Sequence, residues 1–569
     1  MQRPWVSQYD NGVPSGCTYP AFTLPELLQR SADRFPDSPA LVFYGARITF
    51  SELNDLVIRF ACALSELGVR RGDRLAIMLP NVPQAIIGYY GALKAGATIV
   101  QTNPLYLQGE LETQLRDSGA ETILALDLFY PRILPIYQRT ALKRIILTSV
   151  RDFLPPVQRL LYRIKAKLSG RWICIKKRPP LYDFRAMMSN MPSDPECRRS
   201  LPLLLQDELA LLQYTGGTTG TPKGVMLSHR NVVANATQCR AWMPNLREGQ
   251  EVFLGVIPFF HVYGLSTCQH LAIMTGSSLV LLPRFQVKEV LQAIHRHGVT
   301  IFSAIPMMFL KISEFPMVHR YNLRSLRVCL SGASPLHGEV QDRFERLTSV
   351  KISEGYGLTE AGPVTHCNPI NHDRPRGSMG IPFPDTDTRI VDVETGEQMV
   401  PLGDAGELTV RGPQVMQGYW HNEQETRSVM RNGWLYTGDI VRQDDRGFFY
   451  LVDRKKDMIK TRGENVYPRE VEEVLFRHQA VKDVVVAGIA NRQLGEAVKA
   501  YVVLQEGRVV SEPELIDHCR QYLASFKVPL NITFRQELPR TLVGKVLRRA
   551  LQDEEAGKAG IAMQGQANG

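Results

Sequence analysis

Short apolar runs alternate with amphipathic stretches along the first two thirds of the chain. The run RLAIML at 74–79 is followed by PQAIIGYYGALKAG at 83–96 and then by a second apolar run, ATIVQTNP, at 97–104. Apolar runs that alternate with helical patterns are typical of parallel strands joined by helical crossovers. The apolar runs recur at 121–127, 143–149, 251–258, 277–283, 300–306 and 327–333. The pattern therefore predicts a large α/β body.

The pattern changes after about residue 376. Glycine-punctuated segments such as TRIVDVETGE and GELTVRG follow, which is typical of a hairpin-rich region. A polar step, DRKKD at 453–457, then precedes a unit in which a helix, two strands and a second helix follow one another. This order of elements predicts a small α+β unit after the β-rich region.

We therefore predict an α/β fold with two domains. The N-terminal domain spans residues 1–453, with a β-rich part at about 377–453, and the C-terminal domain spans residues 454–569. The tail from about residue 554 is small and polar, and we expect it to be disordered. A chain of 569 residues is also too long for one compact core, because domains usually hold roughly 100 to 250 residues.

A basic segment between about residues 151 and 202 interrupts the α/β pattern and is predicted to be an insertion. One interpretation is a lipid-facing helix, with leucine and isoleucine on one face and basic residues at its rim. The apolar face would hold Leu160, Leu161, Ile164 and Leu168, and the rim Arg159, Arg163, Lys165 and Lys167. The alternative is a surface helix that packs on the body and exposes only its polar face.

The composition narrows the classes of protein and partner. With 44% hydrophobic and 22% charged residues, the chain is not disordered as a whole. A net charge of +10 is compatible with a polyanionic ligand, an anionic membrane surface or a basic surface without a specific partner. The basic residues are scattered, and no zinc, ribonucleoprotein or basic-zipper signature is found. We therefore expect no nucleic-acid partner.

The cysteines and the N-terminal sequence indicate a compartment. Nine cysteines occur without a C-x-x-C pair, so we expect reduced thiols, no disulfide and no structural zinc. The first residues lack the pattern of a secretory signal. The uncharged stretch from Val252 to Pro283 is broken by proline and glycine, and we predict a buried strand, helix and strand rather than a membrane span. We expect a cytoplasmic protein, with peripheral contact at the inner face of the membrane and a homodimer as open alternatives.

A loop rich in glycine and threonine is the clearest candidate site. The strand ELALLQY at 208–214 leads into TGGTTGTPKG at 215–224, and Ser228 is a plausible N-cap of the next helix. Such a loop offers backbone N–H groups and hydroxyls to a polyphosphate, and Lys223 adds a positive charge. It is not a Walker A loop, because Lys223 lies between Pro222 and Gly224. The alternative is a flexible surface turn.

This loop resembles the phosphate loop of the adenylate-forming (AMP-binding) superfamily, which includes acyl-CoA synthetases, firefly luciferase and the adenylation domains of peptide synthetases. Further motifs of that family follow in order over nearly the whole chain. They are IPFFHVYGL (257–265), SGASPL (331–336), EGYGLTE (354–360), GWLYTGD (433–439), DRKKDMIKTRGENVYPREVE (453–472) and LPRTLVGKVLRR (538–549). The run at 101–120 is similar to that of bacterial long-chain fatty-acid CoA ligases.

The resemblance implies the site residues. The ATP site would contain Tyr214, Thr215, Gly216, Gly217, Thr218, Thr219, Gly220, Lys223, Gly332, Ala333, Tyr356, Gly357, Thr359, Asp439 and Arg454. Within it, Tyr356 would stack on adenine, and Asp439 with Arg454 would bind the ribose hydroxyls. Glu360 and Thr218 would hold Mg²⁺, because magnesium prefers hard oxygen ligands.

Three catalytic residues are implied in the same way: Lys545, His261 and Glu360. Lys545 would stabilise charge on the phosphoryl oxygens while the acid attacks the α-phosphorus. His261 would lie between the acyl pocket and the adenylate, although a lone histidine in an apolar region is more often a hydrogen-bonded core residue.

The C-terminal domain would be mobile, by resemblance. One orientation would bring Lys545 to the site for adenylation, and a second would guide coenzyme A over the KTRGENVYP face at 460–468. Lys456 would be the hinge, and a set of three residues would line the coenzyme A channel. That set is Arg462, Gly463 and Glu464.

The resemblance predicts a fatty acid–CoA ligase that uses ATP, Mg²⁺ and coenzyme A, with a medium- or long-chain acid. The alternatives are an adenylating enzyme with another acceptor, such as a carrier protein or oxygen, a ligase for an aryl or short-chain acid, and a non-catalytic binder. The last is disfavoured because Glu360, Asp439, Arg454 and Lys545 are all present.

Overall fold

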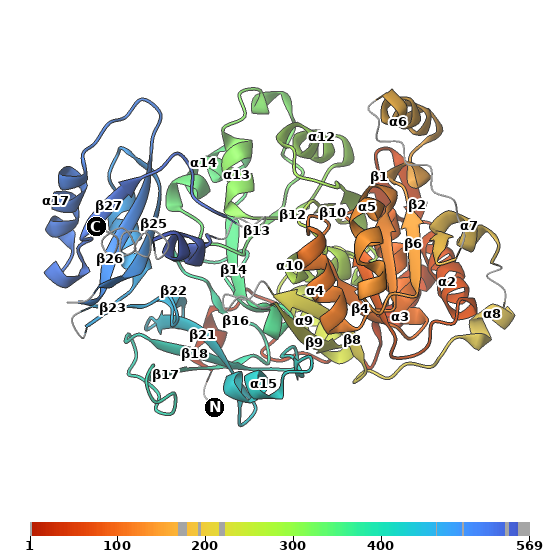
Figure 1. Cartoon of the computed structure of the whole chain (residues 1–569), viewed down its shortest axis with the longest axis horizontal. Helices are drawn as coiled ribbons and strands as arrows, with labels where there is room; N and C mark the ends of the chain where they lie inside the picture. Colours follow the sequence, from red (N-terminus) through yellow and green to blue (C-terminus); the bar gives the residue numbers. More distant parts are fainter. Residues whose placement is uncertain are drawn as a thin grey trace, which may run out of the picture. The chain divides into compact units, whose positions relative to one another are not determined.

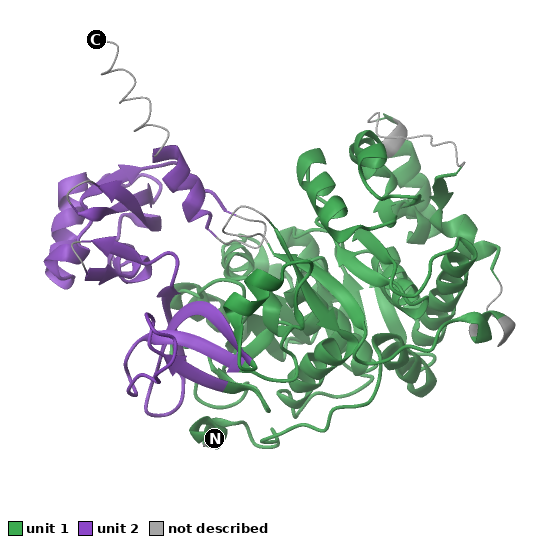
Figure 2. Cartoon of the chain, turned by 60° about the horizontal axis from the view of Figure 1, so that its bottom comes forward, with its two compact units in different colours: residues 1–387, 411–433 green, residues 388–410, 434–569 purple. Residues whose placement is uncertain are grey.

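The computed structural model describes residues 3–168, 179–191, 195–215, 222–461, 464–491, 494–540 and 546–555. These residues form two compact units (Figure 2). Unit 1 comprises residues 1–387 and 411–433, and unit 2 comprises residues 388–410 and 434–569. The β-rich region after residue 387 thus contributes mostly to unit 2. The two units do not test the domain boundary that the sequence analysis places at 453/454, so that boundary stays a prediction.

Two large sheets with mostly parallel strands build unit 1 (Figure 1). The eight-stranded sheet has the order β19-β9-β8-β4-β3-β5-β6-β7. Its strands are β3 (Arg74–Met78), β4 (Thr98–Gln101), β5 (Thr122–Leu126), β6 (Arg144–Thr148), β7 (Leu181–Asp183), β8 (Leu209–Thr215), β9 (Lys223–Ser228) and β19 (Gly418–Tyr419). The six strands from β8 to β7 are parallel, whereas β9 is antiparallel to both of its neighbours.

The nine-stranded sheet has the order β16-β15-β14-β13-β12-β10-β11-β1-β2. Its strands are β1 (Pro39–Phe43), β2 (Ala46–Thr49), β10 (Val252–Gly255), β11 (Ser278–Leu281), β12 (Ile301–Ala304), β13 (Val328–Ser331), β14 (Ile352–Gly357), β15 (Val364–Cys367) and β16 (Ile381–Pro382). In this order, the six strands that run from β14 to β1 are parallel to one another. Their carboxyl ends therefore meet at one edge, where loops can carry a site.

Helices surround these two sheets, and most of them help to bury the apolar runs of the strands. They are α1 (Leu24–Arg34), α2 (Phe50–Glu66), α3 (Pro83–Lys94), α4 (Gln108–Ser118), α5 (Tyr130–Ile133), α6 (Pro156–Leu168), α7 (Phe184–Ser189), α8 (Pro195–Ser200), α9 (His229–Ala241), α12 (Val287–His297), α13 (Pro306–Ser313), α14 (Gly338–Thr348) and α15 (Glu423–Val429). Ser228 caps α9 as predicted, since its side chain accepts a hydrogen bond from the Asn231 backbone. Every residue of the apolar run in β5 is buried, which explains the unbroken hydrophobicity of such strands.

The uncharged stretch from Val252 to Pro283 folds as predicted. Strand β10 is followed by α10 (Val262–Gly264), the π-helix η5 (Leu265–His270), α11 (Leu271–Met274) and strand β11. Within the described part of the chain, no helix combines the length and the apolar character needed to cross a membrane.

Unit 2 contains two smaller sheets. The first contains β17 (Asp387–Val391), β18 (Gly406–Arg411), β21 (Trp434–Gln443) and β22 (Phe449–Arg454). The second contains β23 (Ile459–Thr461), β24 (Glu464–Val466), β25 (Val481–Asn491), β26 (Gly495–Leu504) and β27 (Asn531–Phe534), with α16 (Pro468–Phe476) and α17 (Glu512–Tyr522). The predicted fold class, an α/β body with a smaller α+β unit, is confirmed. The predicted disordered tail lies almost wholly outside the described residues, although Glu554 and Glu555 themselves form ion pairs with Arg535 and Lys499.

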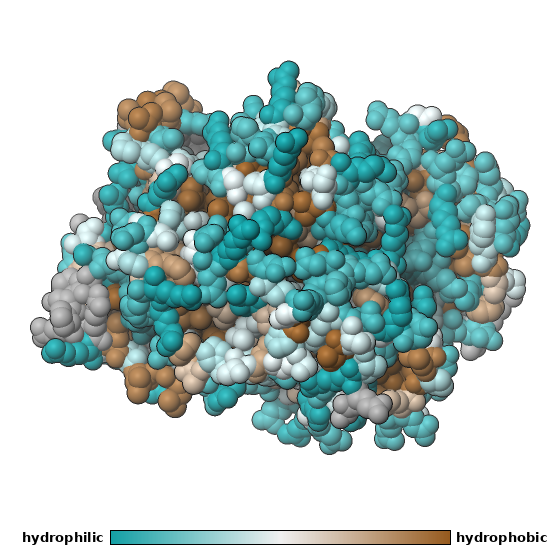
Figure 3. Space-filling view, turned by 180° about the vertical axis from the view of Figure 1, so that it is seen from behind, coloured by the Kyte–Doolittle hydropathy of each residue, from teal (hydrophilic) through white to brown (hydrophobic). Residues whose placement is uncertain are grey.

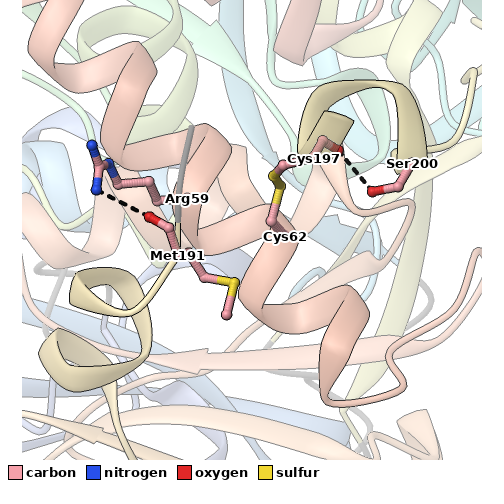
Figure 4. Close-up of a disulfide and its surroundings, with 5 residues drawn as sticks. All are labelled: Arg59, Cys62, Met191, Cys197 and Ser200. Carbon is pink, nitrogen blue, oxygen red and sulfur yellow. Dashed lines mark hydrogen bonds between the residues drawn. A yellow bond between two sulfur atoms is a disulfide. The ribbon is translucent and has the colours of Figure 1, made fainter. Parts of the chain in front are cut away.

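The prediction that the chain contains no disulfide is wrong. Cys62 of α2 and Cys197 of α8 are joined by a disulfide, with their Cα atoms 6.1 Å apart (Figure 4). Nearby, the guanidinium of Arg59 donates a 3.0 Å hydrogen bond to the carbonyl of Met191. The two cysteines are 135 residues apart in sequence, so their proximity depends on how α8 returns to α2. A search for closely spaced cysteines could not detect such a pair.

Candidate nucleotide and acyl site

The predicted phosphate loop connects the antiparallel strands β8 and β9 of unit 1. Thr215, the last residue of β8, is the register partner of Lys223, the first residue of β9. The ammonium of Lys223 pairs with the carboxylate of Glu425 and lies 5.3 Å from the centre of the Tyr419 ring. The antiparallel pairing therefore fixes both ends of the loop and places the predicted phosphate-binding lysine at its exit.

Glu360 lies beside the same tyrosine. The Tyr419 hydroxyl donates a 2.8 Å hydrogen bond to the Glu360 carboxylate, and the backbone N–H of Met416 donates to the Glu360 carbonyl at 2.8 Å. Burial, followed by the charge of Glu360, raises the pKa of Tyr419 well above its ordinary value, so the phenol remains a donor. The structure thus brings Lys223, Glu360 and Tyr419 together. Tyr419 was missed by the sequence analysis, because its place depends on β19 pairing with β9.

Tyr356, Gly357 and Thr359 lie at or just after the carboxyl end of β14. The Tyr356 ring packs edge-on against the ring of His366, with 5.7 Å between ring centres. Gly357 must be glycine, since a Cβ atom there would lie 2.0 Å from the carbonyl oxygen of Pro363. Thr359 opens a short 3₁₀-helix, Thr359–Ala361, that also carries Glu360. The end of β14 and the turn that follows it therefore carry the predicted adenine-stacking tyrosine and the predicted magnesium ligand.

Gly332 and Ala333 follow β13, the neighbour of β14 in the same sheet. Ala333 has a φ of 69°, a left-handed conformation that costs free energy for a residue with a side chain. A Cβ atom at Gly332 would lie 3.2 Å from the Tyr263 ring. The backbone after β13 is therefore closely packed and held in an unusual conformation, as expected where backbone groups serve a ligand.

His261 lies on the loop between β10 and α10. Its Nδ1 accepts a 3.2 Å hydrogen bond from the Tyr263 backbone N–H and so caps α10. The Gln213 side chain of β8 donates a 2.8 Å hydrogen bond to the Phe260 carbonyl. The histidine loop is thereby attached to the strand that ends in the phosphate loop. The Tyr263 hydroxyl donates towards the carbonyls of Ala304 and Leu330, at 3.3 and 3.2 Å, which fixes its ring across the ends of β12 and β13.

In unit 2, Asp439 and Arg454 are register partners on β21 and β22. The Arg454 Nε lies 3.2 Å from the Asp439 carboxylate, and Asp439 is buried. Lys456 follows two residues later in the turn after β22. Loss of solvent around its ammonium, together with the charge of Arg454, lowers its pKa to about 8. The two residues predicted to bind ribose are thus adjacent, and the predicted hinge lies beside them.

Two family matches cover most of the chain. Residues 28–420 match the AMP-binding enzyme family, and residues 470–545 match the AMP-binding enzyme C-terminal domain. The chain belongs to the AMP-binding enzyme family. The resemblance inferred from its motifs is therefore confirmed.

Relatives of this AMP-binding enzyme extend over nearly the full length. The long-chain-fatty-acid–CoA ligase of Bacillus subtilis is 44% identical over 97% of this chain and 98% of the relative. The ligase of the same name from Escherichia coli O6:H1 is 36% identical over 98% of this chain and 99% of the relative. Among solved structures, ATP-bound MatB from Rhodopseudomonas palustris is 26% identical with a TM-score of 0.82 and covers 94% of this chain and 99% of its own. A fatty acyl CoA synthetase from Mycobacterium tuberculosis, 26% identical with the same coverage, has a TM-score of 0.71.

Several predicted residues of this AMP-binding enzyme lie outside the described residues, and their roles stay predictions. They are Gly216, Gly217, Thr218, Thr219, Gly220, Arg462, Gly463 and Lys545. Glu464 is described and begins β24, where it is exposed and is the register partner of Thr461. The Tyr214 hydroxyl donates a 2.5 Å hydrogen bond to the Asp117 carboxylate, which holds the phenol on the β8 side of the loop.

Proposed function

We propose that this chain is an ATP-dependent long-chain fatty acid–CoA ligase. It converts a carboxylic acid, ATP and coenzyme A into acyl-CoA, AMP and diphosphate through an acyl-adenylate. The observation that carries the proposal is the 36–44% identity to named long-chain-fatty-acid–CoA ligases over nearly the whole chain, with both parts of the family present. The arrangement around Lys223 and Glu360 supports the adenylation step.

In the first half-reaction, an oxygen of the acid attacks the α-phosphorus and diphosphate leaves. Catalysis of such a transfer is mostly positioning and electrostatic stabilisation. Lys223 and the loop at 216–221 bind phosphate oxygens, Tyr356 stacks on adenine, and Lys545 stabilises the charge that develops at the α-phosphate. In the free protein Glu425 neutralises Lys223, so binding the phosphates replaces this ion pair.

The carboxylate of Glu360 fits a role in binding Mg²⁺. One of its oxygens is held by Tyr419, which orients the carboxylate and leaves the other oxygen for a cation. Within the described ranges, no group of three His, Cys, Asp or Glu residues could hold a metal ion. A magnesium site completed by nucleotide phosphates is consistent with this, because Mg²⁺ typically uses one or two carboxylates plus substrate oxygens. The ion supplies charge neutralisation of the phosphates, and Thr218 is the second predicted ligand.

In the second half-reaction, the thiolate of coenzyme A attacks the acyl carbonyl and AMP leaves. Asp439 and Arg454 retain AMP through the ribose hydroxyls, since a carboxylate and a guanidinium together offer acceptors and donors to a diol. Glu464 and its neighbours Arg462 and Gly463 line the approach of the pantetheine arm.

We further propose that the protein acts in the cytoplasm, at the inner face of the membrane, as a homodimer.

An assay with a ladder of acids tests the function. Purified protein is supplied with ATP, Mg²⁺, coenzyme A and one acid at a time, from acetate through octanoate to oleate, with 4-coumarate included, and both AMP and thioester are measured. We expect equal amounts of AMP and thioester, with the highest kcat/KM for the long-chain acids. AMP formation that does not depend on coenzyme A would point to another acceptor, such as a carrier protein. A preference for 4-coumarate or acetate would contradict the proposed substrate class.

A further inference from the structure

Helix α6 exposes its apolar side chains instead of burying them. Five apolar residues that are 47–84% exposed recur at a spacing that places them on one helical face, in a sector of about 100°. We call this face the α6 stripe: Val157, Leu160, Leu161, Ile164 and Leu168. Figure 1 shows α6 at the periphery of unit 1, and Figure 3 shows a strongly hydrophobic patch at the corresponding corner of the molecule. The orientation is the reverse of that expected for a helix that packs its apolar face on the body.

The protein itself leaves the α6 stripe uncovered. Among the described elements, only the short helix η4 (Val150–Phe153), which directly precedes it, makes extensive contact with α6. The attachment is made by the other side of the helix, where Arg159 donates a 3.3 Å hydrogen bond to the Leu154 carbonyl. An exposed apolar face of this size on one helix is typical of an interaction surface rather than of a solvated helix.

The charge of α6 indicates the kind of surface that it contacts. Its sequence, PVQRLLYRIKAKL, contains four basic residues and no acidic residue. Two of them, Arg163 and Lys165, are exposed and flank the α6 stripe on opposite sides. A second copy of the chain would bring two such cationic helices together, which is unfavourable. An anionic lipid surface instead offers hydrocarbon to the stripe and phosphate to the flanks.

We propose that α6 is an interfacial helix that binds anionic phospholipid membranes. The α6 stripe enters the boundary between headgroups and acyl chains, and Arg163 and Lys165 contact the headgroup phosphates. Binding of α6 to lipid does not require the proposed enzymatic function. Only the reason for such binding rests on that function, because long-chain acids partition into membranes. Lipid binding by α6 can be measured without turnover, so failure of one proposal is distinguishable from failure of the other.

A vesicle partition experiment tests the inference. The full-length protein is sedimented with large vesicles of phosphatidylcholine alone, or with about one third phosphatidylglycerol, without ATP, acid or coenzyme A. We expect binding to the anionic vesicles that weakens several-fold at high salt. The double variant Leu160→Ser/Ile164→Ser should lose at least tenfold in partition, and Arg163→Gln/Lys165→Gln should lose most of its preference for anionic lipid.

Matched controls and a second measurement keep the test decisive. Leu203→Ser and Val509→Ser replace apolar residues that are at least as exposed but lie elsewhere, and they should bind like the wild type. Thioester formation with octanoate in the absence of vesicles should be unchanged in all variants, which shows that they fold. Equal binding by wild type and stripe variant, or equal binding to neutral vesicles, would overturn the proposal. So would a stripe variant that dissociates a dimer in analytical ultracentrifugation while vesicle binding persists.

Discussion

Tyr419 connects the two charged side chains of unit 1 that are proposed to bind the nucleotide and its magnesium ion. Its hydroxyl holds the Glu360 carboxylate, while its ring lies close to the Lys223 ammonium. The hydrogen bond fixes one oxygen of the carboxylate. The same tyrosine therefore contacts both the proposed magnesium ligand and the proposed phosphate-binding lysine.

The variant Tyr419→Phe tests this arrangement. It removes the donor to Glu360 but keeps the ring, and a hydrogen bond to a charged group contributes about 1.5–3 kcal/mol. We expect kcat/KM for ATP to fall by roughly tenfold to a hundredfold, with a higher Mg²⁺ concentration needed for half-maximal activity. Steady-state kinetics over a series of Mg²⁺ concentrations measure both effects.

The matched control is Tyr436→Phe. That hydroxyl donates a 2.8 Å hydrogen bond to the Gly396 carbonyl in unit 2. Its loss should leave the Mg²⁺ dependence unchanged. A Tyr419→Phe enzyme with the wild-type requirement for Mg²⁺ would show that Tyr419 does not orient Glu360.

At the scale of elements, the sequence predicts best where the signal is local. Buried strands such as β5 and the cap at Ser228 follow from runs of neighbouring residues and were predicted correctly. The disulfide between Cys62 and Cys197 and the position of Tyr419 depend on contacts between distant segments, and no local pattern reports them. For α6, the pattern showed an amphipathic helix, but it could not show which face the body would leave exposed.

Helices α1 and α9 are joined by a histidine that makes their contact sensitive to acid. Nδ1 of His229, at the start of α9, accepts a 3.2 Å hydrogen bond from the backbone N–H of Leu24, at the start of α1. Burial lowers the pKa of His229 to about 4, although the negative charges of Glu208 and Glu26 act in the other direction and raise it. The unfolded state therefore binds a proton more readily between about pH 6.5 and 4. The contribution of His229 to stability is complete above pH 6.5 and is lost as the pH falls through 4.

The variant His229→Asn removes this titration while keeping a possible acceptor for Leu24. Between pH 6.5 and 4, we expect its free energy of unfolding to fall by about 3 kcal/mol less than that of the wild type. Urea unfolding at a series of pH values measures the difference. The exposed His319→Asn is the control and should follow the wild-type profile. Parallel pH profiles for His229→Asn and wild type would refute the assignment.

At the scale of the whole molecule, Arg548 connects residues of unit 2 that lie on both sides of the predicted hinge, Lys456. Arg548, three residues after Lys545, pairs with Glu472 at 2.7 Å and with Asp457 at 3.0 Å. Asp457 directly follows Lys456 in sequence. A longer contact of 3.7 Å joins Arg548 to Asp453, which precedes Lys456. A rotation about Lys456 would therefore keep the pairs of Arg548 with Glu472 and Asp457, which follow the hinge, and would break its contact with Asp453.

Two substitutions should separate the half-reactions in opposite directions. Lys545→Ala removes the charge proposed for adenylation, so acid-dependent exchange of diphosphate into ATP should fall by at least a hundredfold, while thioester formation from supplied acyl-adenylate and coenzyme A should stay within a fewfold of wild type. Lys456→Pro fixes φ and removes a backbone N–H at the hinge, so rotation should be hindered. It should spare the exchange reaction and slow thioester formation. Both reactions are followed on the same preparations, because a misfolded variant would lose both. If each variant impaired the two half-reactions equally, the C-terminal domain would not alternate between them, and Lys545 would act in a single arrangement throughout the reaction.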